Sequence, residues 1–226
     1  MKIEIYSDLI CPWCYIGKRR MQAALKLLGK DFTPKIVWRP FQLNPEMPIE
    51  GMNRKTYRTK KFGSWERSLV MDAEVAATGK GLGIEFNYDK VLMTPNTLAG
   101  HRLLRWAEQQ NYQDHLAEAL FMAYFTNGRD VGRHDVLAEI AAEVGLSQAE
   151  AIVFLDSDGG KKEVEEEALK GLKLGLQGVP FFVVNDVPAF SGAQTPRTFL
   201  EVFQQALGKD APECGVESCK TASFAK

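Results

Sequence analysis

Cysteine is scarce in this sequence, with four residues in 226: Cys11, Cys14, Cys214 and Cys219. Four cysteines are too few to staple a chain of this length, and 45% apolar residues are enough to bury a core without them. A disulfide-scaffold protein is therefore excluded. In a reducing compartment, paired cysteines more often serve metal or redox chemistry.

An excess of charge and long apolar runs are lacking as well. The formal net charge of −1 argues against a broad electrostatic surface for nucleic acid or anionic lipid. No window offers the roughly 18 uncharged apolar residues of a membrane span, and Glu4 and Asp8 interrupt the N-terminal segment before it can form a signal peptide. We therefore expect a cytoplasmic protein without nucleic-acid or membrane partners, either a monomer or a homodimer.

A β-α-β pattern opens the chain. Apolar alternation predicts a short strand ending near Ser7, followed by a helix in which Pro12 suits the first turn. Gly29 ends that helix, and residues 35–38 read as a second strand parallel to the first. Residues 39–63, with three prolines and no clean period, are expected to form a connecting loop.

Helical periodicity then dominates residues 64–176. Within this block, Thr94 is expected to cap a helix that begins at Pro95 and carries an apolar stripe. Strands return after Gly178: an apolar β run is followed by an Asn-Asp pair that suits a two-residue turn to an antiparallel strand. A closing helix is expected over residues 195–207.

The predicted architecture is α/β, with one discontinuous domain and one insertion. Residues 1–63 and 177–208 would rejoin as one sheet with its helices (βαβ then ββα). Residues 64–176 would form a large all-helical insertion. Residues 209–226 are small and polar and are expected to be a flexible, cysteine-containing tail.

Two of the cysteines form a Cys-Pro-Trp-Cys motif where the first helix begins. A helix N-terminus presents unpaired N–H groups and partial positive charge, which favour the thiolate form of Cys11. In such motifs the thiol pKa falls by about one to five units, which stabilises the reduced form and makes the disulfide an oxidant. Cys14, one turn along and facing inward, is expected to resolve a mixed disulfide at Cys11.

Other residues around these cysteines are candidates for supporting roles. Pro12 and Trp13 lie between the cysteines, and Trp13 is expected to be exposed as a contact for partner chains. Asp8, three residues before the motif, would either relay a proton or cap the end of the strand.

A second signal lies far downstream, in Gly178-Val179-Pro180. Pro180 could simply punctuate the start of a strand, where proline is tolerated. The functional interpretation is a cis Val179-Pro180 bond, which would turn the Val179 backbone outward beside Cys11. There it could pair with an extended substrate peptide.

Two interpretations without redox chemistry stay open for the motif. A four-cysteine zinc site would join Cys11 and Cys14 to Cys214 and Cys219, although zinc ribbons place such a motif on a turn and not at a helix start. A purely structural disulfide is disfavoured, because a bridge across one helical turn closes almost no loop.

Together these elements resemble the DsbA family of thioredoxin-fold oxidoreductases over residues 1–208. The segments IYSDLICPWCYIG, PNTLAGHRLLRWA and GVPFFVVN are most similar to its FrnE-like branch. The resemblance implies a thioredoxin-like fold and a cytoplasmic thiol-disulfide oxidoreductase or isomerase. It also implies that a redox-active disulfide takes the place of a bound cofactor or metal, and that protein thiols, disulfides or glutathione are the partners.

Some FrnE-like proteins carry a C-terminal pair of cysteines with four residues between them, which matches Cys214 and Cys219. The resemblance therefore implies an auxiliary redox pair that passes electrons to or from Cys11 and Cys14. Inert thiols and a metal site are the alternatives for this pair.

A relative of another class is also similar. Kappa-type glutathione transferases and related isomerases share this architecture but have serine in place of Cys11. That resemblance makes Asn96 and His101 candidates for lining a small-thiol pocket, against a simpler interpretation as ordinary helix residues. The alternative function is therefore a glutathione-dependent transferase or isomerase.

Overall fold

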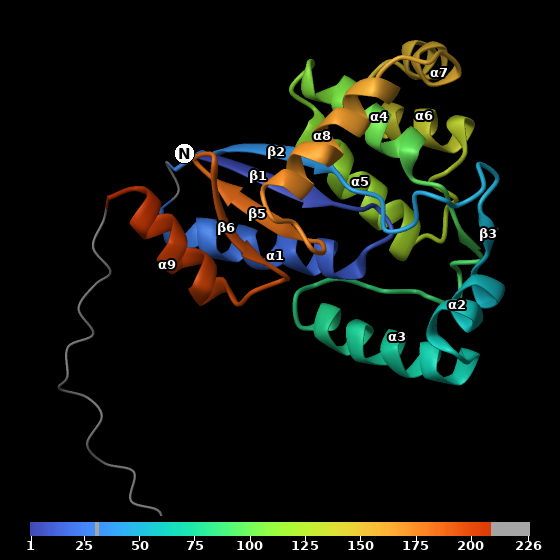
Figure 1. Cartoon of the computed structure of the whole chain (residues 1–226), viewed down its shortest axis with the longest axis horizontal. Helices are drawn as coiled ribbons and strands as arrows, with labels where there is room; N and C mark the ends of the chain where they lie inside the picture. Colours follow the sequence, from blue (N-terminus) through green and yellow to red (C-terminus); the bar gives the residue numbers. More distant parts are fainter. Residues whose placement is uncertain (30–31, 209–226) are drawn as a thin grey trace, which may run out of the picture.

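The computed structural model describes residues 1–29 and 32–208, and places a four-stranded sheet between layers of helices (Figure 1). The strand order is β2-β1-β5-β6. The bounds are β1 Lys2–Ser7, β2 Lys35–Pro40, β5 Phe181–Val184 and β6 Val187–Ser191. Because β1 pairs parallel with β2 and antiparallel with β5, strands from both ends of the chain meet at β1. The α/β class and the rejoining of two distant segments in one sheet are confirmed.

Alternation along β1 divides the buried side chains between the two faces of the sheet. Ile5 lies opposite Phe182 on β5, whose ring contacts Phe199 edge-on at 4.8 Å between centroids. This is the face that α1 (Pro12–Leu27) and α9 (Pro196–Ala206) cover. Tyr6 points the other way, and Gly171 of α8 (Lys161–Lys173) lies so close to its ring that any side chain there would clash.

Helices fill most of the chain between β2 and β5. Their bounds are α2 Arg54–Phe62, α3 Trp65–Lys80, α4 Leu98–Glu108, α5 Gln113–Phe125, α6 His134–Glu143, α7 Gln148–Asp156 and α8 Lys161–Lys173. A short antiparallel ladder joins β3 (Met52–Asn53) to β4 (Met93–Thr94). None of the helices in the described ranges has the length and apolar character to cross a membrane. The division into a sheet domain and an inserted domain stays a prediction.

β3 and α2 lie within the segment that the sequence predicts to be a connecting loop, so that prediction is wrong for residues 52–62. The helix has the sequence RKTYRTKKF and no apolar stripe to reveal it. Two interactions outside its own pattern stabilise it. The Asn53 side chain accepts the Thr56 N–H at 3.1 Å, and Asp72 of α3 forms ion pairs with both arginines of α2.

The start predicted for the helix near residue 95, which is α4, is also wrong. α4 begins at Leu98 and not at Pro95, because Thr94 belongs to β4 and is paired with β3. Thr97 occupies the N-cap position, and the side chain of Asn96 accepts the Leu98 N–H at 2.9 Å.

Three other predictions from short-range signals are confirmed: the hairpin turn, the closing helix and the start of the first helix. Asn185 and Asp186 have φ of 49° and 64°, the left-handed conformations that a two-residue hairpin turn requires. Thr195 caps α9 by accepting the Thr198 N–H at 3.3 Å. α1 begins at Pro12, with Cys11 in the N-cap position.

Candidate active site

Cys11 stands at the point where β1 has ended and α1 begins. Its N–H donates to the Asp8 carbonyl at 3.0 Å, and the N–H of Cys14 donates to the Cys11 carbonyl at the same distance. Pro12 takes the first helical position, where a backbone N–H would have no acceptor within the helix, so the N–H that proline lacks costs no hydrogen bond. The Cys11 side chain is therefore held at the positive end of the helix, with 5% of its surface exposed.

Cys14 lies one turn further along and is completely buried. Burial raises the pKa of the Cys14 thiol well above its ordinary value, and the neighbouring Cys11 adds to this effect. The two thiols thus differ in access: only Cys11 reaches the surface. This is the arrangement that an attacking and a resolving thiol require.

The second predicted segment lies against Cys11. The Cys11 thiol donates to the Val179 carbonyl at 3.6 Å, and the Val179–Pro180 peptide bond is cis. Pro180 packs on α1 at Gly17, where an added Cβ would lie only 3.1 Å from the proline Cγ. Glycine at position 17 therefore lets the proline approach the helix that carries the cysteines.

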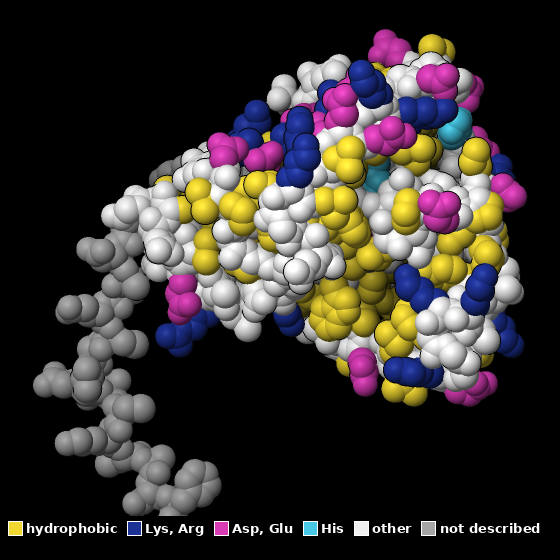
Figure 2. Space-filling view, in the orientation of Figure 1, with side chains coloured by type: hydrophobic (Ala, Val, Ile, Leu, Met, Phe, Trp, Pro, Cys, Tyr) yellow, Lys and Arg dark blue, Asp and Glu magenta, His cyan; other side chains and the backbone are white. Residues whose placement is uncertain are grey.

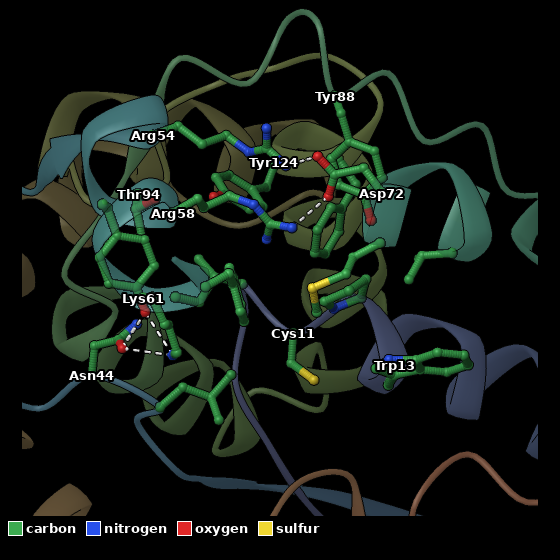
Figure 3. A pocket seen from close by; sticks show the side chains of 18 of the residues that line it. Cys11, Trp13, Asn44, Arg54, Arg58, Lys61, Asp72, Tyr88, Thr94 and Tyr124 are labelled. Carbon is green, nitrogen blue, oxygen red and sulfur yellow. Dashed lines mark hydrogen bonds and ion pairs between the residues drawn. The ribbon is translucent and has the colours of Figure 1, made fainter. Parts of the chain in front are cut away.

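A cavity of about 290 Å³ opens beside Cys11. In Figure 3, Cys11 and Trp13 lie on one side of it, and side chains from α2, α3 and α5 lie on the other. Trp13 is 42% exposed, as predicted for a partner contact. Figure 2 shows hydrophobic side chains gathered over the middle of this face, with Lys and Arg side chains near α2.

The cavity carries charge that the sequence prediction missed. Arg54 and Arg58 of α2 pair with Asp72 of α3 at 2.6 and 2.8 Å, and Lys61 lies one turn further along α2. Burial raises the pKa of Tyr88, so its hydroxyl remains protonated. The sequence shows the spacing of these three cations, but the spacing predicts a shared helix face only if residues 54–62 are helical.

Asp8 and His101 meet beneath the end of β1, away from the lining of the cavity. Both are buried, and Asp8 Oδ1 lies 3.5 Å from His101 Nε2. The other oxygen of Asp8 accepts the Leu43 N–H at 2.7 Å, which ties the following loop to the strand end. The structure thus places Asp8 as a cap on the strand end, and its role in proton transfer stays a prediction.

Asn96 is not part of the cavity either. Its amide donates to the Met47 carbonyl at 2.7 Å, and its Oδ1 accepts from Gln42 at 3.2 Å and from the start of α4. Asn96 therefore fixes the loop after β2. Cys214 and Cys219 lie outside the described residues, and across residues 1–29 and 32–208 no three His, Cys, Asp or Glu side chains are grouped as metal ligands.

A sheet built from both ends of the chain, a Cys-x-x-Cys motif at a helix N-terminus and a proline segment against it define a thioredoxin-fold protein of the disulfide-exchange class. The family model described as DSBA-like thioredoxin domain matches residues 2–204, and the chain belongs to this family.

Individual relatives agree with this assignment. The chain is 28% identical over 212 residues to the uncharacterized protein YwbO of Bacillus subtilis, covering 92% of this chain and 96% of that one. It is similar to the probable DsbA oxidoreductase SCO1869 of Streptomyces coelicolor, at 29% identity and a TM-score of 0.85, with 99% and 100% of the chains covered. The fold also matches the cytosolic disulfide reductase DsbM of Pseudomonas aeruginosa, at 16% identity and a TM-score of 0.63, with 92% and 96% covered. Neither the zinc-binding nor the transferase alternative is favoured by these matches.

Proposed function

We propose that the protein is a thiol-disulfide oxidoreductase or isomerase in which Cys11 exchanges with the substrate and Cys14 resolves the intermediate. One observation carries the proposal: a Cys11 thiol at a helix N-terminus that lines the cavity, with a fully buried Cys14 thiol one turn behind it. Pro12 and Trp13 shape the surface around the sulfur. Val179 and Pro180 position the substrate opposite it.

The reaction balances with these two thiols alone. Reduced Cys11 attacks one sulfur of a substrate disulfide, the substrate S–S bond breaks, and one substrate thiolate leaves. Cys14 then gives up its proton to solvent and attacks Sγ of Cys11, which releases the second substrate thiolate. The protein loses two electrons and the substrate gains them; the reverse sequence oxidises a dithiol.

The wider assignments belong to the same proposal. The partners are protein thiols and disulfides or a small thiol, consistent with DsbM, a protein of the same fold described in complex with GSH. A FrnE-like branch position and a cytoplasmic location follow from the sequence resemblance. Cys214 and Cys219 would pass electrons to the active-site pair.

Stoichiometric reaction of the reduced protein with a model disulfide tests the proposal. Cys214→Ser and Cys219→Ser are included throughout, so that only the active-site thiols react. Cys11→Ser should slow the reaction by about a hundredfold or more, because the nucleophile is lost. Cys14→Ser should accumulate a mixed disulfide at Cys11, visible as added mass. An unchanged rate in the Cys11 variant would reject the function.

A further inference from the structure

The cavity beside Cys11 combines an apolar wall with a group of cations and hydrogen-bond donors, which restricts what it can bind. Three cationic side chains, Arg54, Arg58 and Lys61, line it together with one carboxylate, Asp72. Both oxygens of Asp72 are engaged, one by each arginine. The lining therefore carries a net charge of +2.

Lys61 is the cation best placed to receive a ligand. Its Nζ donates to Asn44 Oδ1 at 3.1 Å and to the Tyr57 hydroxyl at 2.6 Å, both neutral groups. Within the described residues it has no carboxylate partner. In Figure 3 it lies with Asn44 at the side of the cavity away from Trp13.

Two further polar atoms in the lining have no partner in the described part of the chain: Asn44 Nδ2 and the Tyr88 hydroxyl. Asn44 Oδ1 already accepts from Lys61, so the amide presents a donor. The Tyr88 hydroxyl also has a proton to donate. Buried donors without partners cost free energy, and an acceptor-rich ligand would satisfy them.

The remaining wall is apolar, with Phe62, Met71, Val75 and Phe125 among its residues. At about 290 Å³ the cavity is at the lower end of the size range for small-molecule sites. An apolar wall with a few cations and donors at one side suits a small organic anion better than a folded protein surface.

We propose that this cavity is the binding site for a small thiol, or its disulfide, that carries carboxylate groups, with Lys61 and Arg58 binding a carboxylate while the sulfur meets Cys11. This inference rests on the proposed function and deepens it by naming the substrate class. The reaction remains the exchange described above: the substrate S–S bond breaks, and its two sulfurs leave as thiolates.

Two aromatic disulfides separate charge recognition from chemistry. Dithiobis(nitrobenzoate) has a carboxylate on each ring, whereas dithiodipyridine is neutral at pH 7. The reduced full-length protein, again with Cys214→Ser and Cys219→Ser, is mixed with each reagent at low ionic strength, and the rate of thiol release is followed. The readout is the ratio of the anionic to the neutral rate, because this ratio cancels changes in the intrinsic reactivity of Cys11.

Lys61→Gln should lower this ratio about two- to fivefold, the range of one partly exposed ion pair. Lys61→Arg should keep it. Lys55→Gln is the matched control, because it removes the same charge from the same helix at a position outside the cavity. An unchanged ratio in Lys61→Gln, or an equal fall in both Gln variants, would overturn the inference while leaving the function intact. No reaction of Cys11 with either reagent would reject the function and this inference with it.

A competition arm distinguishes the small molecule from an acidic protein segment. S-methylglutathione, which carries carboxylates but no free thiol, should inhibit the anionic reaction, and more weakly in Lys61→Gln. Inhibition by a glutamate decapeptide but not by S-methylglutathione would overturn the small-molecule assignment.

Discussion

The thiol of Cys11 lies 3.6 Å from the carbonyl oxygen of Val179, although 168 residues separate them in the chain. The pairing of Tyr6 with Phe181 brings the ends of β1 and β5 together and so sets this distance. The reactive sulfur is therefore positioned by the sheet as well as by its own helix.

The two thiols should react with an alkylating reagent in a fixed order. In the reduced native protein, iodoacetamide at neutral pH should modify Cys11 about tenfold or more faster than Cys14, because Cys14 is fully buried and its pKa is raised. Peptide mass spectrometry over time measures both rates, and unfolding in urea should remove the difference. Preferential labelling of Cys14 would contradict the arrangement.

The buried thiol should make stability fall at high pH. The pKa of Cys14 is raised in the folded state, so its contribution is fully present below the unfolded pKa of about 8.5 and is lost as pH rises towards the folded value. The free energy of unfolding of Cys11→Ser, minus that of Cys11→Ser/Cys14→Ser, should decrease by up to about 1.4 kcal/mol per pH unit between pH 9 and 10. Urea unfolding measures both. A difference that increases over this range would show that the sign is wrong.

Gly17→Val should damage the active site through Pro180. A Cβ at position 17 would already lie 3.1 Å from the Pro180 Cγ and 3.4 Å from the Phe182 ring, and valine adds two methyl groups. We expect a loss of stability of about 1–3 kcal/mol and a slower exchange per folded molecule. Gly81→Val, just past the end of α3 at a site without such close contacts, is the control for adding a β-branched side chain. Equal exchange rates in both variants would show that this packing does not position the proline.

Arg102 should be a structural residue of the helical region. Its guanidinium is buried and donates to the carbonyls of Phe154, Leu155, Ser157 and Gly159 at 2.5 to 3.1 Å, where α7 ends. Arg102→Ala should cost about 3–5 kcal/mol, because it leaves these acceptors without a donor. Calorimetry or urea unfolding measures this loss. Arg133→Ala, at an exposed side chain, should cost far less than Arg102→Ala, and similar losses of stability for the two would contradict the assignment.

Local sequence signals were enough to predict the elements nearest the cysteines. Pro12 and the residues before it specify a helix start, and Asn185-Asp186 specifies a hairpin turn, because both depend on conformations fixed within a few residues. The same holds for Thr195 and the closing helix. The motif and the proline segment could therefore be assigned to the right elements without a structure.

Features that depend on distant partners could not be predicted in this way. α2 has no apolar stripe, and its stability comes from Asp72 on another helix. Thr94 looks like a helix cap until β3 pairs with it. The contact between Asp8 and His101 likewise exists only because α4 packs against the residues that follow β1.

The assembly of the sheet from both ends of the chain has a consequence for biosynthesis. Cys11 is translated 168 residues before Val179, which at 5–20 residues per second is an interval of roughly 8 to 34 s. Throughout that time the nascent chain lacks β5, so its first cysteine is present on the ribosome before the carbonyl that faces it in the finished protein. The contact between the Cys11 thiol and the Val179 carbonyl can therefore form only late in translation.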